Sequence, residues 1–294
     1  GYYASAAAST NQSPCEIGSF QPNSGQSRCL AAGPGHYVDT NASVTQTMCD
    51  FGTYQPYSSS SSCFDADPGH YVDSTGSSSQ IACLIGTYNP DIASNSSTSC
   101  LAADQGHYVP NNGSSVQLVC MPGTYQPNLA QSSCIDADSG YYVDSYQAIS
   151  QEPCSLGTYQ PQAAQIGCYG ADPGYYVDLS AAAMQTPCPA GFYNPFSLST
   201  NPESCINADL GYYVPSEGSS SQTICLEGTY QSSEGQSSCI DSPEGAYVMN
   251  QGQSEFIECL EGTYQPNAKS VTCLDADIGH FSSGKMSISQ TPCA

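Results

Sequence analysis

Two stretches decide the fold, Cys154-Ser-Leu-Gly-Thr-Tyr-Gln-Pro161 and Ala171-Asp-Pro-Gly-Tyr-Tyr-Val-Asp178. Each holds a glycine followed by an aromatic residue two places on, and the two glycines are 17 residues apart. This triplet recurs through the chain at that spacing, except for two gaps of 20 residues. We call its members the repeat glycines: Gly1, Gly18, Gly35, Gly52, Gly69, Gly86, Gly106, Gly123, Gly140, Gly157, Gly174, Gly191, Gly211, Gly228, Gly245, Gly262 and Gly279. A fixed period predicts a tandem-repeat protein.

Two longer periods lie on top of this one. Type A units, which carry cysteine three residues before the repeat glycine, alternate with type B units, which carry alanine there, so a full repeat has 34 residues. The longer units start 105 residues apart, which predicts super-repeats at residues 86–190 and 191–294 after five short units in residues 1–85. The repeat pattern is incomplete at both ends of the sequence, so we expect the chain to be an excerpt of a longer repeat protein.

The composition predicts a small disulfide-rich fold without a large aromatic core. The chain has no Trp and 7 Phe, but 22 Tyr and 17 Cys. A 17-residue unit cannot bury enough apolar surface alone, so it needs neighbouring units and covalent crosslinks. No window has sustained helical periodicity. We expect a linear rod of hairpin-like units, mostly β or irregular, with almost no helix.

Charge and cysteine content restrict the partners and the location. The net charge is −23, and the only basic residues are Arg28, Lys269 and Lys285. Such a chain cannot neutralise phosphates, which excludes a nucleic-acid partner. No apolar run is long enough for a membrane span. Many cysteines at fixed spacing, without the CxxC pairs of zinc ribbons, indicate an oxidising compartment, which means the cell surface, the secreted space or the periplasm; of these we expect an extracellular or cell-surface location.

Cysteine spacing allows pairing across short loops, as in Cys15 to Cys29, or across long loops, as in Cys29 to Cys49. The repeat favours the short loops, because type B units replace both cysteines of the short-loop pair together, by alanine and glutamine. These replacements are Ala32 with Gln46, Ala66 with Gln80, Ala137 with Gln151, Ala171 with Gln185, and Ala276 with Gln290. We therefore expect disulfides Cys15–Cys29, Cys49–Cys63, Cys83–Cys100, Cys120–Cys134, Cys154–Cys168, Cys188–Cys205, Cys225–Cys239 and Cys259–Cys273, with Cys293 unpaired in this segment.

The type A units, Cys-x-x-Gly-Thr-Tyr-Gln-Pro leading to Ser-Ser-Cys, resemble the ephrin-receptor-like cysteine-rich repeats, relatives of the smallest modules of tumour-necrosis-factor receptors. That family joins its units through Cys-x-x-Cys-Pro-x-Gly-Tyr-Tyr, whereas Cys168-Tyr-Gly-Ala171-Asp-Pro-Gly-Tyr-Tyr176 has alanine at the second cysteine. The resemblance covers nearly the whole chain and implies an extracellular rod of short β-hairpins. It implies no ligand, because the family's binding functions belong to particular members.

Each unit is expected to start on a glycine turn, form a short strand at its aromatic residue, and return through a Ser/Asn/Gly loop to a second strand near its cysteine. The recurring ring is expected to pack between successive units as a core ladder. Its members include Phe20, Tyr37, Tyr54, Tyr71, Tyr88, Tyr108, Tyr125, Tyr142, Tyr159 and Tyr176.

The histidines carry no catalytic signal. His36, His70, His107 and His280 all follow a repeat glycine in type B units, where other copies carry Tyr. A metal ligand or general base would need partners at matching positions. We expect packed polar rings and no enzyme activity.

Two other residue classes suggest ligands or modifications. Acidic clusters beside glycine turns offer hard oxygen ligands for calcium, although such aspartates more often bind local backbone amides. Calcium is thus the weaker hypothesis, and no other cofactor is expected. The calcium candidates are Asp65, Asp67, Asp73, Asp136, Asp138 and Asp144. The glycosylation candidates are Asn41, Asn95 and Asn112, with a weaker sequon at Asn11.

The sequence therefore favours a structural function: a fibre, surface appendage or adhesin stalk that self-associates into a polymer and is stiffened by disulfides and stacked tyrosines. The alternative is a receptor or adhesin ectodomain that binds a ligand. In that case the unit that departs most from the repeat, Ser242 to Glu258, is the best candidate site, because Ser242 and Phe256 replace its alanine and glutamine.

Overall fold

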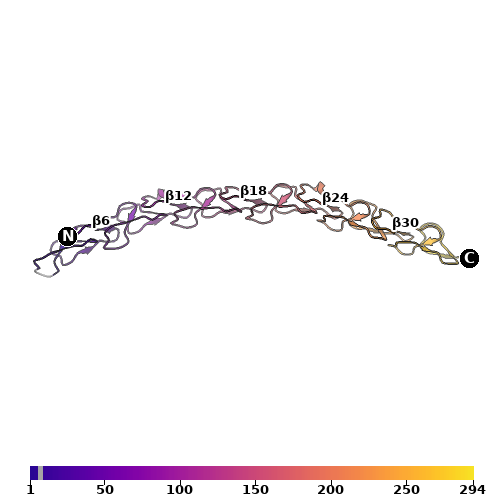
Figure 1. The fold of residues 1–294 in the computed structure, drawn as a ribbon, viewed down its shortest axis with the longest axis horizontal. Coiled ribbons are helices and arrows are strands. Elements are labelled where there is room, and N and C mark those ends of the chain that lie inside the picture. Colours follow the sequence, from indigo (N-terminus) through magenta and orange to yellow (C-terminus); the bar gives the residue numbers. More distant parts are fainter. Residues whose placement is uncertain (6–8) are drawn as a thin grey trace. The chain divides into compact units, whose positions relative to one another are not determined.

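The computed structural model describes residues 1–5 and 9–294, and its regular secondary structure there consists almost entirely of two-residue strands paired into antiparallel hairpins, joined by turns and loops. The chain divides into two compact units, residues 1–136 with 143–151 (unit 1) and residues 137–142 with 152–294 (unit 2). Along each unit the hairpins follow one another in sequence order (Figure 1). This is the disulfide-rich tandem hairpin repeat that the sequence predicts.

The strands of unit 1 are β1 (Tyr2–Tyr3), β2 (Ser13–Pro14), β3 (Ser19–Phe20), β4 (Leu30–Ala31), β5 (His36–Tyr37), β6 (Thr47–Met48), β7 (Thr53–Tyr54), β8 (Phe64–Asp65), β9 (His70–Tyr71), β10 (Ile81–Ala82), β11 (Thr87–Tyr88), β12 (Leu101–Ala102), β13 (His107–Tyr108), β14 (Leu118–Val119), β15 (Thr124–Tyr125) and β16 (Ile135–Asp136).

The strands of unit 2 are β17 (Tyr141–Tyr142), β18 (Glu152–Pro153), β19 (Thr158–Tyr159), β20 (Tyr169–Gly170), β21 (Tyr175–Tyr176), β22 (Thr186–Pro187), β23 (Phe192–Tyr193), β24 (Ile206–Asn207), β25 (Tyr212–Tyr213), β26 (Thr223–Ile224), β27 (Thr229–Tyr230), β28 (Ile240–Asp241), β29 (Ala246–Tyr247), β30 (Ile257–Glu258), β31 (Thr263–Tyr264), β32 (Leu274–Asp275), β33 (His280–Phe281) and β34 (Thr291–Pro292). The helical content of the described residues is two short 3-10 turns, η1 (Ser97–Ser99) and η2 (Pro202–Ser204).

Each hairpin is built on its repeat glycine. In the unit of Gly157, the amide and the hydroxyl of Thr158 both donate to the carbonyl of Ser155, at 3.0 and 2.7 Å, and close the turn. The amide of Ala171 donates to the Gly157 carbonyl at 2.8 Å, at the end of the paired strands that lies next to this turn. Gly157 has a φ of 78°, in the left-handed region that glycine enters without steric cost.

Backbone hydrogen bonds join each hairpin to the next one. The amide of Gly157 donates to the carbonyl of Val177, and that of Gln160 to Ala182, at 2.8 and 3.0 Å. In the opposite direction, the amide of Ala181 donates to the carbonyl of Cys154 at 2.8 Å. Equivalent bonds recur along both units. Neighbouring hairpins are therefore held together through backbone groups and do not depend on particular side chains at these positions.

The repeat glycines also contact the hairpin two units further on. A Cβ added to Gly174 would lie 2.1 Å from the carbonyl oxygen of Gly218, and one added to Gly35 would lie 2.0 Å from that of Gly76. Units of one type thus stack directly on units of the same type. Glycine is required at this position for two reasons: the positive φ angle and the lack of space for a Cβ atom.

The buried core is a column of small and polar residues, which corrects the expected tyrosine ladder. Fully buried positions lie three residues before and three residues after the repeat glycine, as in Cys154, Gln160, Ala171 and Val177. The recurring tyrosines between them are partly exposed and flank this column. The reason is space: the backbones of successive hairpins approach too closely for rings to lie between them.

The buried glutamines of type A units satisfy their own loops. Gln160 is 2% exposed; its Nε2 donates to the carbonyl of Gly167 at 2.7 Å, and its Oε1 accepts the amide of Gln162 at 3.2 Å. A buried amide with these partners costs little, because its polar atoms are paired. The Gly-Thr-Tyr-Gln-Pro motif therefore identifies a loop that is closed by the side chain of its own glutamine.

Candidate functional site

The cysteines of the type A units are joined across their short loops. Cys154 is bonded to Cys168 with a Cα–Cα distance of 5.8 Å, within the usual range for disulfides. The same pairing occurs at Cys15–Cys29, Cys49–Cys63, Cys83–Cys100, Cys120–Cys134, Cys188–Cys205, Cys225–Cys239 and Cys259–Cys273. Cys293 is free and exposed. Each bond closes one hairpin and leaves the links between hairpins to the backbone.

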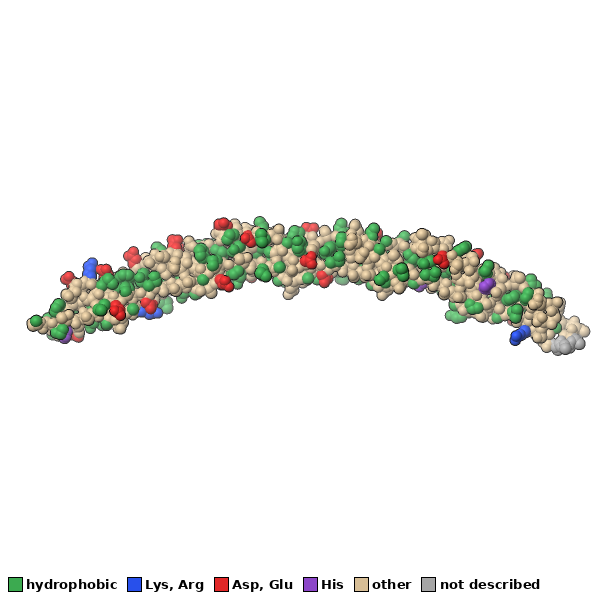
Figure 2. Space-filling view, turned by 180° about the vertical axis from the view of Figure 1, so that it is seen from behind, with side chains coloured by type: hydrophobic (Ala, Val, Ile, Leu, Met, Phe, Trp, Pro, Cys, Tyr) green, Lys and Arg blue, Asp and Glu red, His purple; other side chains and the backbone are tan. Residues whose placement is uncertain are grey.

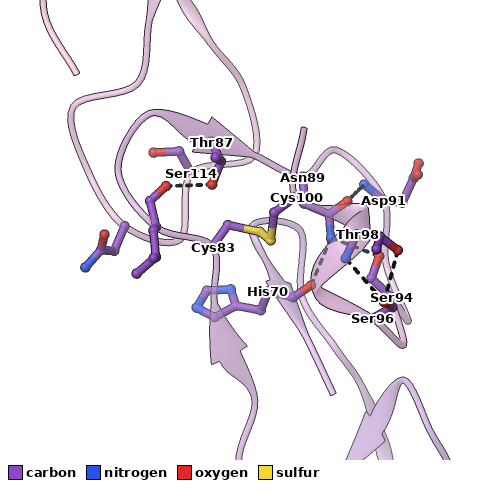
Figure 3. The surroundings of a disulfide bond; sticks show 12 residues. His70, Cys83, Thr87, Asn89, Asp91, Ser94, Ser96, Thr98, Cys100 and Ser114 are labelled. Carbon is purple, nitrogen blue, oxygen red and sulfur yellow. Dashed lines mark hydrogen bonds between the residues drawn. A yellow bond between two sulfur atoms is a disulfide. The ribbon is translucent and has the colours of Figure 1, made fainter. Parts of the chain in front are cut away.

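The two long units accommodate their three extra residues within the disulfide loop. In the first of them, η1 comes directly before Cys100 (Figure 3), and asparagine replaces the buried glutamine. Asn89 Nδ2 donates to the Ser94 hydroxyl and to the carbonyl of His70, both at 2.9 Å. Asn194 makes the equivalent bonds to Ser199 and Tyr175. The two long loops therefore share one specific hydrogen-bonded structure.

Type B units replace the disulfide with a paired hydrogen bond between Asp and Gln. In the unit of Gly174, the Asp172 amide donates to Gln185 Oε1, and Gln185 Nε2 donates to the Asp172 carboxylate, both at 2.8 Å. The same clamp joins Asp67 with Gln80, Asp104 with Gln117, Asp209 with Gln222, and Asp277 with Gln290. The glutamine that stands in for cysteine thus keeps a cross-loop link, which sequence reasoning missed.

Two tyrosines beside these clamps have raised pKa values. Burial raises the pKa of the Tyr54 and Tyr159 hydroxyls, and the carboxylates of Asp67 and Asp172 raise them further. Both tyrosines thus stay neutral over the physiological pH range.

The proposed calcium ligands are dispersed. Asp67 forms a clamp, Asp65 and Asp136 lie in strands β8 and β16, and Asp73 and Asp144 are exposed after buried valines. Asp138 also has an interaction of its own. In residues 1–5 and 9–294, no group of three His, Cys, Asp or Glu side chains is placed to hold a metal ion. The geometry favours local structural roles for these aspartates.

The histidines bind their own turns. Nδ1 of His36, His70 and His107 lies 3.1, 3.3 and 3.0 Å from the carbonyl oxygen two residues earlier. The His70 ring also lies against Gly113, as the Tyr175 ring lies against Gly218 in unit 2. At the position after the repeat glycine, His and Tyr therefore make the same packing contact.

The sequon asparagines are all exposed. Asn41 and Asn112 use Oδ1 to accept the backbone amides of Ile17 and Ile85, at 3.1 and 2.8 Å. A glycan is attached through Nδ2, so this contact does not compete with modification. Asn95 lies in the long loop just before η1, and Asn11 precedes β2.

The unit that departs most from the repeat absorbs its differences by packing. Ser242 is fully buried, and its Oγ accepts the amide of Ser270 at 3.0 Å. The Phe256 ring packs edge-on against Tyr230, with ring centroids 5.4 Å apart. Both contacts join this hairpin to its neighbours, so the two substitutions that made Ser242 to Glu258 a candidate ligand site have structural explanations.

Four surface pockets, which we call the junction pockets, recur where a type B unit meets the following type A unit. The type B hairpin contributes the tyrosine two residues after its repeat glycine. The type A unit contributes three residues: the one two places before its repeat glycine, the one directly after that glycine, and the second cysteine of its disulfide. Tyr247, Leu260, Thr263 and Cys273 enclose about 310 Å³ in this way. The Tyr3, Tyr71 and Tyr213 pockets have the same lining positions and volumes of about 640, 230 and 250 Å³.

The surface of the chain carries far more acidic than basic side chains. Figure 2 shows acidic side chains dispersed across the visible face, among many exposed hydrophobic side chains. Basic side chains are rare on it, as expected from a net charge of −23. The surface favours cationic over anionic ligands.

Comparison with protein families finds a match at the start of the chain. The family model described as "Tyrosine-protein kinase ephrin type A/B receptor-like" matches residues 1–49. A search of curated proteins finds no match to this chain. The resemblance expected from the type A units is thus confirmed over those residues, and together with the disulfides it points to an extracellular or cell-surface location. No helix among the described residues is long and apolar enough to cross a membrane.

Proposed function

We propose that this chain is a structural repeat segment of an extracellular fibre, surface appendage or adhesin stalk. The observation that supports this most is the backbone bonding between successive hairpins within each unit, as in Gly157 to Val177 and Ala181 to Cys154. Because each hairpin contacts only near neighbours, copies can be added without changing the contacts, and length follows from copy number. Such a role needs no catalysis, and we infer that the chain is not an enzyme.

We further propose that the 105-residue super-repeat, residues 86–190 and 191–294, spaces lateral contacts between copies in a polymer. The long loops carry exposed apolar side chains: Ile92 and Phe196 are both 63% exposed. An apolar residue at a loop tip is a suitable contact for a neighbouring copy. Glycans at Asn41, Asn112 or Asn11 would occupy other exposed surface, whereas a glycan at Asn95 would stand in the first long loop beside Ile92 and compete with this contact.

Electron microscopy of the purified chain tests this role. We expect filaments or bundles to form as added salt screens the repulsion between chains of net charge −23. The double variant Ile92→Ser with Phe196→Ser should stay dispersed under the same conditions, while Leu179→Ser, an equally exposed residue outside the long loops, should assemble normally. Discrete particles of the unaltered chain at every salt concentration would contradict the polymer.

The alternative is a receptor-type or adhesin ectodomain, which the match of residues 1–49 to a receptor-like family supports. This function requires a ligand site, and the junction pockets are the recurring concave features that provide one. Discrete particles in the microscopy experiment would favour it over the fibre.

A further inference from the structure

Three of the four junction pockets have a carboxylate at their edge. Glu258 lines the Tyr247 pocket, Asp241 lines the Tyr213 pocket, and Glu16 lines the Tyr3 pocket. The rest of each lining combines a tyrosine ring with a threonine or serine and, in the Tyr213 and Tyr247 pockets, a leucine. These linings combine apolar walls with one carboxylate, and those of the Tyr213 and Tyr3 pockets also include a basic side chain, Lys269 and Arg28.

All three basic side chains of the protein lie at these three pockets. Lys269 Nζ is 3.4 Å from the Asp241 carboxylate, and Lys285 Nζ is 3.7 Å from that of Glu258. Arg28 lines the Tyr3 pocket together with Glu16. Of the three basic residues in 294, two are thus paired with a pocket carboxylate, and the third lines a pocket that also has one. The basic side chains of the chain itself are therefore examples of the kind of group, a cation on a flexible side chain, that can lie at these pockets.

The internal ion pairs are weak enough to be exchanged. The side chains of Lys269 and Lys285 are 61% and 67% exposed, and those of their partners Asp241 and Glu258 are 56% and 42% exposed. Exposed pairs of this kind contribute little, because water solvates both charges nearly as well when they are apart. An external cation can therefore displace the internal one at small cost.

We propose that the Tyr213 and Tyr247 junction pockets bind lysine or arginine side chains of a basic polypeptide partner. The aliphatic part of such a side chain would pack on Leu226 or Leu260, its charge would meet the carboxylate, and the tyrosine ring favours a nearby cation. The net charge of −23 attracts such a partner over a long range. A second copy of this chain is a poor occupant, because it has three cations to offer.

The two pockets are suited to bind one partner together. They lie in unit 2, in consecutive full repeats, with their tyrosines 34 residues apart. A polypeptide with cations spaced along it can occupy both, and the second contact then costs less entropy than the first. A single cation would gain no such advantage.

The test titrates the chain with a synthetic Gly/Ser peptide that carries several spaced lysines, followed by calorimetry and by NMR signals of the Leu226 and Leu260 methyl groups. We expect saturable binding that shifts both methyl signals. The variants Glu258→Gln and Asp241→Asn should each weaken binding about two- to fivefold, the range for one exposed ion pair. Leu260→Asn should weaken it without any change of charge.

Two controls separate pocket binding from general attraction. Glu217→Gln removes one exposed negative charge away from the pockets and should leave the affinity within error. The same peptide with acetylated lysines should not bind. Equal losses for Glu217→Gln and Glu258→Gln, or unchanged methyl signals, would overturn the proposal. So would equally tight binding of a free polyamine, because it would show that no polypeptide is needed.

Discussion

Gly174→Ala is expected to destabilise unit 2 by at least about 3 kcal/mol, or to prevent its folding. The new methyl group would lie 2.1 Å from the carbonyl oxygen of Gly218, and the backbone φ of 94° is unfavourable for alanine. Backbone atoms cannot move aside without breaking the hydrogen bonds of the next hairpins. Thermal unfolding and amide hydrogen exchange of the neighbouring hairpins measure the loss.

Two further glycine variants separate the causes. Gly25→Ala places alanine at a φ of 75° with no atom within 4 Å, so it should cost about 1 kcal/mol. Alanine already occurs at this repeat position with a similar φ, as in Ala130 and Ala181. Gly167→Ala meets neither obstacle and should change the stability by no more than about 0.5 kcal/mol. If Gly174→Ala unfolds like Gly167→Ala, the close approach of alternate hairpins is wrong.

Removing one disulfide should have the second-largest effect. The double variant Cys154→Ala with Cys168→Ala opens a loop of sequence separation 14, which should cost about 3 kcal/mol of local stability. The residue at the equivalent buried position in type B units is alanine, as in Ala171, so the substitution itself creates little strain. Hydrogen exchange of the Ala171 and Ala181 amides reports the loss locally, which suits a repeat array better than a single global transition.

A matched variant tests whether the clamp replaces the disulfide. Cys154→Ala, Ser155→Asp and Cys168→Gln together convert this type A unit into a type B unit. The new Asp–Gln pair should restore about 1 to 2 kcal/mol relative to the double alanine variant, since it forms two cross-loop hydrogen bonds, one of them to a charged group. No recovery would mean that type B units are held by something other than their clamps.

The fold was largely predictable because its main constraints are local. The 17-residue period, the hairpin turns and the near absence of helix all follow from glycine, aromatic and cysteine positions within one unit. The paired replacement of cysteines by alanine and glutamine, as at Ala171 and Gln185, also predicted the short-loop connectivity that the structure contains.

The features that the sequence did not predict are contacts in three dimensions, which the spacing of residues along the chain does not reveal. The close contact of Gly174 with Gly218 joins units that are not adjacent in sequence, so a turn appeared to be a sufficient reason for glycine. Gln160 was assigned no role, because a polar side chain is usually exposed, yet its loop encloses it. Asp67 is one of the calcium candidates, although the glutamine that follows such an aspartate at a constant distance of 13 residues, here Gln80, is the signal that identifies the clamp.

Peptide mapping of the oxidised, non-reduced protein tests the central claim most directly, namely that each type A hairpin is closed on itself and linked to its neighbours through the backbone. Because the chain has three basic residues, a protease that cleaves after aromatic or leucine residues is preferable to trypsin. The account predicts the short-loop peptides, with Cys15 bonded to Cys29 and Cys49 bonded to Cys63. Recovery of Cys29 bonded to Cys49 would contradict it, because the covalent links would then join successive hairpins instead of closing each one.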